Sequence, residues 1–573
     1  MPKRIPYGVA NYEEIVRDNA YFVDKTAHIP LLENVRNPVF LRPRRFGKSL
    51  WCSVLQHYYD VRLADRFEAL FGHTWIGQHP TPHHNRYLVL PLDFSVIQVE
   101  KDIAGIEHNF KKYCNDILRM LPLFYPEYMR GMPEMPMENA VAANLSSWFS
   151  FIRVTGAPSV YVIIDEYDSF VNQLIDMPHD HLFQQMTTGD SFLRAFFKVL
   201  KQGRQSGAVA NVFVTGVLPI TMDDLASGFN IASYITLDPK FENMLGFTQS
   251  EVDALLDAIY QDYVLDPATR GEVGEVIKSQ YNGYHFINPE GEAVYNSTIL
   301  MYFLDHLCHH REITEYLTDM NLRTDLAWVR RITGAQPGLT EAFVTQLTTE
   351  NAIRYDRDFL VSKFNMRQFF DPSFFPISFF YLGMLTRRDM FEMRLPNLNM
   401  RKIFVEYFNE LQNIDVSMRY TDVMRAFVAE PNLERLFTGY WELYVSQLPE
   451  ALFAQMDENF YRTTFFELCS RYLSPWFTWN VERSYPQGRT DLEFVGKYHA
   501  QFAGLRWVIE FKYYSNAEFK RFGVPIAEFE LQPSDTEQIA GYVTGLRQEY
   551  PEAQVRQYVI YCFGNQGFRV FEV

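Results

Sequence analysis

The stretch VFLRPRRFGKSLW, residues 39–51, passes from a short apolar run into a basic loop and then into a helical pattern. The run before the loop is of strand type, and the residues after it place apolar side chains at helical spacing. A strand, a loop and a helix in this order direct free helix N–H groups at a phosphate. In this pattern Gly47 lets the backbone approach the phosphates, Lys48 contacts them, and the Ser49 hydroxyl binds Mg²⁺. The stretch therefore predicts a nucleotide site.

The loop departs from the usual pattern G-x-x-x-x-G-K-[ST] at its first glycine, where this chain has Arg42. A basic loop that only caps a helix is therefore an alternative to a working site. Arg44 and Arg45 follow in the same loop. The sequence leaves open whether these two contact phosphate, a neighbouring subunit of a homo-oligomer or surface acids, and Arg45 is kept as a candidate for nucleotide binding.

A second predicted strand ends in acids. Residues 160–164 read VYVII, an almost continuously apolar run that is typical of a central strand in a parallel sheet covered on both faces. Asp165 and Glu166 follow directly, at the edge where open α/β sheets bind ligands. Asp165 is predicted to hold Mg²⁺ through water, and Glu166 to orient or deprotonate the attacking water. Acids that cap the next helix are the alternative, but their combination with the loop favours an ATPase.

Two further runs, YLVLPLDFS at 87–95 and NVFVTGVLPIT at 211–221, are expected to be strands of the same sheet. In P-loop ATPases of the additional-strand type, the strand after the acidic one carries a polar residue at its tip that senses the γ-phosphate. Thr215 is the candidate here, and a threonine that merely ends a strand is the alternative. The predicted fold class is α/β, with a P-loop core of this additional-strand type.

Length and charge limit the remaining possibilities. A chain of 573 residues is too long for one hydrophobic core, and its 47% hydrophobic residues indicate folded domains throughout. The net charge of −17 opposes the binding of a polyanion over the whole surface. A nucleic-acid site must therefore be a local basic groove or depend on metal ions.

The five cysteines lie far apart and form no C-x-x-C pair, so neither a disulfide framework nor a zinc site is indicated. The first residues contain no apolar signal region, and no run approaches about eighteen apolar residues. We therefore expect a cytoplasmic protein without a membrane-spanning segment.

The C-terminal part of the chain carries a second set of charged residues. WNVERSYPQGRTDLEFV, residues 479–495, contains Asp491, and LRWVIEFKYY, residues 505–514, contains Glu510 and Lys512. In a strand, Glu510 and Lys512 point to the same face. Two carboxylates can hold Mg²⁺ while the lysine positions the nucleophile or stabilises the transition state of phosphodiester cleavage. Alternating charges on an exposed strand are the alternative, but the apolar neighbours of this pair favour a ligand site.

Five stretches together resemble the bacterial AAA-ATPase-like proteins that are fused to a PD-(D/E)XK nuclease domain. They are IPYGVANYEEIVRDNAYFVDKT (5–26), RPRRFGKSL (42–50), VIIDEYD (162–168), VTGVLPITMDDLASGFNI (214–231) and YNGYHF (281–286). Members of that family carry RPRRFGKS as their phosphate loop, so the resemblance implies that Arg42 belongs to a working site. It also implies a nuclease domain after the ATPase, and a role in defence against phage or mobile elements.

The resemblance implies further residues in the C-terminal part. The order of a helix, a hairpin with Asp491 and a strand with E-x-K is similar to the PD-(D/E)XK core. Gln538 and Tyr542 resemble its Q-x-x-x-Y element, which supports the metal ion or the DNA backbone. A further acid is expected from the preceding helix, either Glu458 or Glu467, and the sequence does not decide between them.

We therefore expect three domains: an ATPase domain at 1–240, a helical lid and connector at 241–400, and an α/β nuclease-like domain at 401–573 with its core at about 455–573. ATP bound to the first domain is expected to gate Mg²⁺-dependent cleavage of nucleic acid by the last, with DNA as the expected substrate. One alternative is a nucleotide-regulated switch whose nuclease-like domain binds nucleic acid or a partner protein without cutting. Another is an ATPase motor whose C-terminal domain is structural.

Overall fold

The computed structural model describes residues 2–169, 173, 191–219, 229–318, 330, 332, 337–361, 366–486 and 488–573. The chain divides into two compact units. Unit 1 consists of Met1–Leu255, Tyr284–Met301 and Tyr355–Phe391, and unit 2 consists of Leu256–Gly283, Tyr302–Arg354 and Glu392–Val573. The division falls within two helices, α12 (Gln249–Asp262) and α14 (Ser297–His310). No helix in the described ranges is both long enough and apolar enough to cross a membrane.

Unit 1 is built around a five-stranded sheet with the strand order β2-β3-β4-β1-β5, in which all neighbours run parallel. The strands are β1 (Pro38–Leu41), β2 (Leu88–Asp93), β3 (Val160–Asp165), β4 (Val209–Gly216) and β5 (Ser233–Tyr234). β4 lies between β1, which precedes the phosphate loop, and β3, which ends in the acids. This order confirms the predicted P-loop core with an additional strand, and every strand predicted for that core is present.

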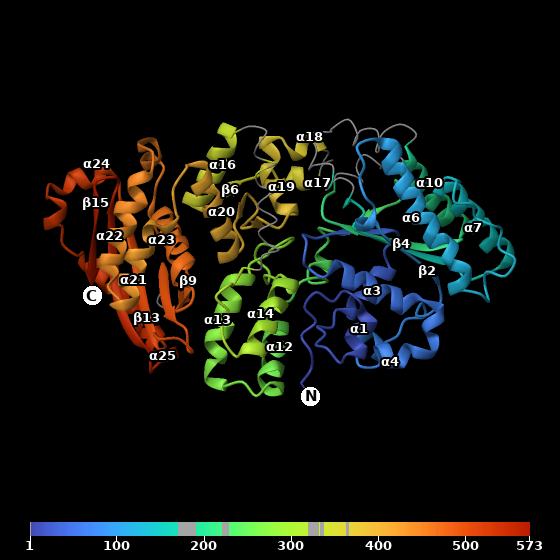
Figure 1. The fold of residues 1–573 in the computed structure, drawn as a ribbon, viewed down its shortest axis with the longest axis horizontal. Helices are drawn as coiled ribbons and strands as arrows, with labels where there is room; N and C mark the ends of the chain where they lie inside the picture. Colours follow the sequence, from blue (N-terminus) through green and yellow to red (C-terminus); the bar gives the residue numbers. More distant parts are fainter. Residues whose placement is uncertain are drawn as a thin grey trace. The chain divides into compact units, whose positions relative to one another are not determined.

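Helices cover both faces of the unit 1 sheet (Figure 1). α3 (Lys48–Tyr59) packs against β2 and β3, while α10 (Phe192–Ser206) packs against β4 and α7 (Val141–Thr155). Because both faces are covered, β1 and β3 are buried at every position, which explains their continuously apolar sequences. The other helices and the short strand of unit 1 are α1 (Tyr12–Arg17), α2 (Ile29–Glu33), α4 (Phe67–Phe71), α5 (Trp75–Gln78), α6 (Ile103–Phe124), α17 (Asp358–Val361), α18 (Met366–Phe369), α19 (Phe375–Tyr381) and β7 (Thr386–Arg387).

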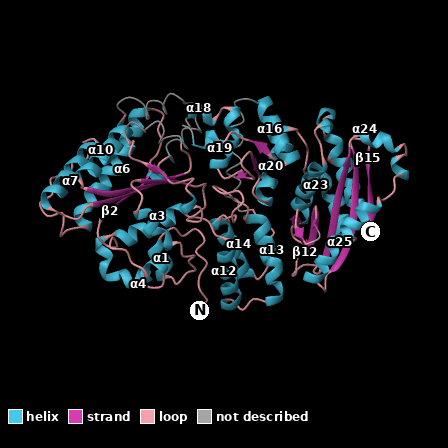
Figure 2. Cartoon of the chain, turned by 180° about the vertical axis from the view of Figure 1, so that it is seen from behind, coloured by secondary structure: helices cyan, strands magenta, loops and turns pink. Residues whose placement is uncertain are grey.

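Unit 2 contains a second five-stranded sheet, in the order β15-β14-β13-β12-β9. β13 and β14 run parallel, and the other neighbours run antiparallel. The parallel pair is connected through α25 (Pro533–Glu549), which packs against both strands. This mixed sheet with its crossover helix confirms the α/β C-terminal domain. The strands, drawn in magenta in Figure 2, are β9 (Phe477–Val481), β12 (Leu492–Gly496), β13 (Leu505–Tyr514), β14 (Gln554–Phe563) and β15 (Gly567–Glu572).

The remaining elements of unit 2 are helices and short strands that flank this sheet. The helices are α13 (Arg270–Tyr281), α16 (Pro337–Glu350), α20 (Leu398–Leu411), α21 (Thr421–Ala429), α22 (Leu433–Leu443), α23 (Glu458–Leu473) and α24 (Asn516–Phe519). The short strands are β6 (Ile353–Arg354), β8 (Glu392–Arg394), β10 (Ser484–Tyr485) and β11 (Gly488–Arg489). β10 and β11 form a small antiparallel hairpin that leads the chain into β12.

The central strand β13 presents different residues to its two sides. Val508 belongs to the hydrophobic core that includes α25, whereas the ring of Phe511 lies 6.1 Å from that of Phe437 on α22. Side chains alternate along a strand, so Glu510 and Lys512 share the side of Val508. The predicted period of two therefore places both charged residues beside α25.

Candidate functional site

The phosphate loop joins the end of β1 to the first turn of α3. Gly47 has a left-handed backbone conformation with φ +91°, which other residues rarely adopt, so this position favours glycine. Lys48 and Ser49 open α3, at the helix end that carries free N–H groups and partial positive charge. The buried Lys48 ammonium donates to the Pro43 carbonyl at 3.1 Å and lies 3.5 Å from a carboxylate oxygen of Glu166. The loop thus brings three predicted residues together with Glu166.

Arg42, at the position of the first glycine in the usual pattern, is a buried structural anchor. Its guanidinium donates to the carbonyl oxygens of Leu41 at 3.0 Å and Thr236 at 2.9 Å. It also lies over the rings of Phe40 and Phe286, at 4.3 and 4.6 Å from their centres. A guanidinium offers five N–H donors, so this one side chain ties β1 to the segment after β5. The arginine stabilises the base of the loop and is not one of the residues that line the cavity beside it.

The acids after β3 lie beside the loop. Asp165 accepts a hydrogen bond from the Ser49 hydroxyl, and burial raises the pKa of Asp165 to about 6. Asp165 is also in register with Asp93 of the neighbouring strand β2. Glu166 has a left-handed backbone conformation with φ +50°, and its carboxylate faces Lys48. A hydroxyl and a carboxylate in contact are a pair of oxygen ligands that suits Mg²⁺.

Asp168, two residues further on, has a structural task. Its buried carboxylate accepts hydrogen bonds from the backbone N–H groups of Val217 and Leu218, at 2.7 to 3.1 Å. Burial raises the pKa of Asp168 to about 6. A Cβ atom at Gly216 would lie 2.3 Å from the Asp168 carboxylate, so the close approach of these segments requires glycine there. Asp168 thereby fastens the acidic segment to the end of β4.

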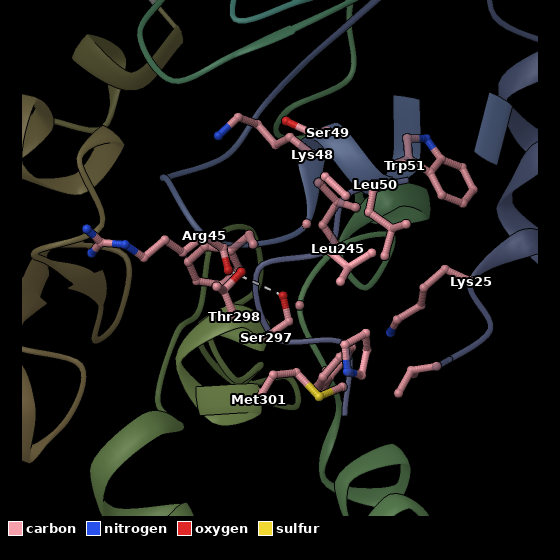
Figure 3. Close-up of a pocket in the computed structure, with 18 of the residues that line it drawn as sticks. Lys25, Arg45, Lys48, Ser49, Leu50, Trp51, Leu245, Ser297, Thr298 and Met301 are labelled. Atoms are coloured by element: carbon pink, nitrogen blue, oxygen red, sulfur yellow. Dashed lines mark hydrogen bonds between the residues drawn. The ribbon is translucent and has the colours of Figure 1, made fainter. Parts of the chain in front are cut away.

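A cavity of about 310 Å³ opens beside the loop (Figure 3). Lys48 and Ser49 lie at one end of the view, and Met301 lies at the opposite end. The acid Glu166 also belongs to the lining. Much of the remaining lining is apolar and includes Val9, Ile15, Phe22, Leu245 and Phe247. Binding pockets for small molecules combine an apolar lining with a few polar groups that fix orientation. This cavity therefore combines the polar groups of the loop with a largely apolar lining.

Two predicted nucleotide contacts are placed differently. Arg45 lines the cavity, but its side chain extends away from the other labelled residues in Figure 3. Its carbonyl accepts hydrogen bonds from the Ser297 hydroxyl at 3.3 Å and the Thr298 N–H at 3.1 Å, so the start of α14 fastens the loop. Thr215 donates its hydroxyl to the Phe40 carbonyl at 2.8 Å within the sheet, and the described residues that line the cavity do not include it.

The second set of predicted residues converges in unit 2. Asp491 lies immediately before β12, and its carboxylate accepts the N–H of Phe511 in β13 at 2.8 Å. Glu510 accepts hydrogen bonds from the Lys512 ammonium at 2.9 Å and from the Gln538 amide of α25 at 2.7 Å. The Gln538 oxygen in turn lies 3.1 Å from the Lys512 nitrogen. Residues from three separate stretches of sequence therefore form one polar cluster.

The helix before the sheet contributes Glu458 to this cluster, and Glu467 lies elsewhere. Burial, and then the charge of Asp491, raises the pKa of Glu458 to about 7. The same two causes raise the pKa of Glu510 to about 8. Glu467, by contrast, accepts a hydrogen bond from Arg471 of its own helix at 3.1 Å. The acid that α23 brings to Asp491 is therefore Glu458.

The cluster has the character of a cation site. Oxygen Oε2 of Glu510 is buried and, among the described residues, has no hydrogen-bond partner. The raised pKa values of Glu458 and Glu510 show that nearby positive charge does not fully compensate these carboxylates. A divalent ion would supply that charge. Over the described ranges no three His, Cys, Asp or Glu side chains already stand together as a metal-binding group, so binding requires the carboxylates to draw closer.

Sequence reasoning missed Arg462, which lies one helical turn after Glu458 on α23. Its guanidinium donates to Asp491 at 2.6 Å and lies 3.1 Å from a carboxylate oxygen of Glu482. The spacing of Glu458 and Arg462, four residues apart on a helix, was the available signal, because such residues lie on the same side of the helix. The cluster therefore contains two cations, Arg462 and Lys512, beside its three acids.

Comparison with known proteins agrees with these two sites. Residues 6–226 match the family described as "Predicted AAA-ATPase", and residues 456–572 match the PD-(D/E)XK nuclease superfamily. Over 541 residues the chain is 24% identical to an uncharacterized protein in the vnfD 5′ region of Azotobacter chroococcum mcd 1, and the match covers 89% of each chain. The chain thus joins an AAA-ATPase-like domain to a C-terminal domain of the PD-(D/E)XK nuclease superfamily, which confirms the resemblance seen in its motifs.

Proposed function

We propose that this protein binds and hydrolyses ATP in the unit 1 cavity, and that its nucleotide state gates a Mg²⁺-dependent nuclease in unit 2 that cuts DNA. The observation that carries the proposal is the polar cluster of Asp491, Glu510 and Lys512 in a domain of the nuclease superfamily, on the same chain as a phosphate loop. The five buried free cysteines support a reducing compartment, the cytoplasm. Defence against phage or mobile elements rests on the resemblance and stays a prediction.

In unit 1 the proposed roles follow from the contacts. Lys48 contacts the Glu166 carboxylate and the Pro43 carbonyl. Among the described residues Glu166 is its one carboxylate partner, so a triphosphate that enters the cavity would meet a cation that is only partly neutralised. Ser49 and Asp165 would hold Mg²⁺, which when bound neutralises charge on the phosphates. Release of Glu166 from Lys48 would leave that carboxylate able to orient the attacking water.

In unit 2 the three acids Glu458, Asp491 and Glu510 would hold divalent metal, which when bound supplies an activated water and neutralises phosphate charge. Burial lowers the pKa of Lys512, but the adjacent Glu510 carboxylate outweighs this and raises it. Lys512 therefore stays positively charged and can stabilise the negative charge that develops on a phosphodiester oxygen. Gln538 contacts both Glu510 and Lys512 and keeps the pair in one orientation. Metal ions at this cluster would also let an acidic chain bind a polyanion locally.

Cleavage assays with the full-length protein test the proposal. Linear DNA, circular DNA and RNA are incubated with Mg²⁺, with and without ATP. We expect DNA cleavage by the wild type and a loss of at least about 100-fold in Glu510→Gln, because that change removes a metal ligand. Glu467→Gln is the matched control: it neutralises a buried acid of the same domain that is paired with Arg471.

Three outcomes would contradict the proposal. If the wild type cuts no polymer under any nucleotide condition but binds DNA, the non-cutting switch is the better account. If RNA alone is cut, the proposed substrate is wrong. If Glu510→Gln and Glu467→Gln lose cleavage equally, the assigned cluster is wrong.

A further inference from the structure

The Asp491 carboxylate lies at the end of a chain of alternating charges within unit 2. Arg401 of α20 donates to Glu482 at 2.5 Å, the other oxygen of Glu482 lies 3.1 Å from Arg462, and Arg462 donates to Asp491 at 2.6 Å. The side chains are between 5% and 21% exposed, so water screens these pairs only weakly. Three ion pairs in series thus join α20 to a proposed metal ligand.

We infer that Arg462 is the positioning residue for Asp491, and that Arg401 and Glu482 hold Arg462 in place, so that α20 sets the geometry of the proposed metal site. The inference rests on the proposed nuclease function. It adds the point at which structure outside the residues matched to the nuclease superfamily, 456–572, acts on that site.

Both oxygens of Asp491 are anchored. Arg462 binds Oδ1, and the N–H of Phe511 binds Oδ2 at 2.8 Å, so the carboxylate plane has one orientation. Arg462 can do this because its guanidinium is a rigid fork. One nitrogen reaches Asp491, and the other reaches Glu482 and the Asn459 side chain at 2.6 Å. A lysine offers a single nitrogen and cannot span these partners in the same way.

Glu482 is itself fixed in an unusual conformation. It directly follows β9 and has φ +55°, a left-handed value that is uncommon for a residue other than glycine. Its backbone N–H donates to the carbonyl oxygen of Asp491 at 3.1 Å, so Glu482 contacts Asp491 through the backbone as well as through Arg462. Such conformations persist where the surrounding contacts hold them, and they cluster at functional sites.

Arg401 is the member of the chain that lies outside the nuclease match. Glu482, Arg462 and Asp491 lie within the matched residues 456–572. Arg401 belongs to α20, which ends at Leu411, before the match begins. Without Arg401, Glu482 would keep Arg462 and the exposed Arg489 as cationic partners. Its side chain would then be less firmly placed, so Arg462, and through it Asp491, would have a less fixed position.

Metal binding measures this effect without any cleavage. Full-length proteins are titrated calorimetrically with Mn²⁺ in the absence of ATP and nucleic acid, and Asp491→Asn identifies the heat that depends on this site. We expect Arg401→Met to weaken Mn²⁺ binding about tenfold, the usual effect of removing a residue that orients a metal ligand. Arg462→Lys should lie between the wild type and Arg462→Met.

Arg489→Met is the matched control. Arg489 lies 3.4 Å from the same Glu482 carboxylate, but it is 60% exposed and has no part in the chain to Asp491. Its loss should leave Mn²⁺ affinity unchanged. If Arg401→Met does not fold, Glu482→Gln removes the same link while keeping the side-chain shape, and the same tenfold loss is expected.

Wild-type or tighter Mn²⁺ affinity in folded Arg401→Met would overturn the inference, since tighter binding would show that the arginines compete with the metal. An equal loss in Arg489→Met would overturn it as well, because the effect would then be general electrostatics. If the wild type shows no Asp491-dependent Mn²⁺ binding at all, the proposed metal site, and with it the proposed nuclease function, is wrong. That result differs from one in which the wild type binds Mn²⁺ and Arg401→Met binds it equally well, which would contradict only the role of Arg401.

Discussion

The two candidate sites of this chain are assembled in opposite ways. The nucleotide site takes Gly47, Lys48 and Ser49 from one continuous strand, loop and helix, and it opens into a cavity of about 310 Å³. The nuclease-like site collects its side chains from α23, the start of β12, β13 and α25, and its groups already contact one another. The first site is therefore local in sequence and open, and the second is dispersed in sequence and compact.

The two sites also differ in the sign of the charge that their side chains leave uncompensated. In unit 1 the buried Lys48 lines a cavity, which suits an anionic ligand. In unit 2 the acids outnumber the cations, and burial and mutual repulsion raise the pKa of Glu510 to about 8. The charge balance of each site is the basis of the proposed ligands, a phosphate in the first and a metal ion in the second.

The largest expected effect is a loss of stability in unit 1, and it tests whether the nucleotide site depends on contacts outside its local motif. Arg42→Gly restores the usual first glycine, yet it leaves the buried carbonyls of Leu41 and Thr236 without their donor. We expect the free energy of unfolding of unit 1 to fall by about 2–4 kcal/mol, and ATP binding to weaken with it. Hydrogen exchange of β1 and α3 measures the change.

The control for this substitution is Arg36→Gly, an exposed arginine just before the same strand. Glycine there should cost no more than about 1 kcal/mol. Unchanged protection of β1 in Arg42→Gly would show that the arginine does not anchor the loop.

A smaller effect is expected on Mn²⁺ affinity at the dispersed site, and it tests which acid of α23 belongs to that site. Glu458→Gln removes one acid from the cluster, and we expect Mn²⁺ binding at the Asp491-dependent site to weaken about tenfold. Glu467→Gln, on the same helix but fully buried, should leave Mn²⁺ affinity at the wild-type value because Glu467 pairs with Arg471. Calorimetric titration compares the two variants directly, and equal losses would contradict the assignment of Glu458.

The smallest expected effect is a difference between the two sites in how their metal affinity depends on pH. Metal binds the deprotonated carboxylate, and Glu510 has a pKa of about 8, so raising the pH from 7 to 8 removes its proton and strengthens binding. Loss of the Glu510 proton alone gives an increase of about fivefold in Mn²⁺ affinity over that range, and loss of the proton from Glu458, whose pKa is about 7, acts in the same direction. Asp165, with a pKa of about 6, is already deprotonated at pH 7, so Mg²⁺ binding with ATP in unit 1 should change little. Titrations at both pH values would contradict this if the two sites responded alike.

The local site was largely predictable from sequence, and the dispersed one only in part. Gly47, Lys48, Ser49 and the acids after β3 lie in short stretches whose order alone implies contact. Glu510 and Lys512 were also predictable, because the period of a strand is fixed. The choice between Glu458 and Glu467 was not, since α23 is buried on nearly all sides and its sequence has no clear polar face.

The remaining surprises share one physical cause, which is contact between segments far apart in sequence. The role of Arg42 depends on carbonyls almost two hundred residues later in the chain. Arg462 could be tied to Asp491 only once the sheet was known. Thr215 was predicted from its place at a strand tip, but its hydroxyl bonds the neighbouring strand, a contact that needs the strand order.

The most direct test of the central claim is the rate of DNA cleavage with and without ATP, measured for the wild type and for Lys48→Ala. The account predicts that ATP changes the wild-type rate about fivefold or more, a typical coupling between two sites, and leaves the Lys48→Ala rate unchanged. A wild-type rate that ignores ATP, or an equal response in Lys48→Ala, would contradict gating of the nuclease through the phosphate loop.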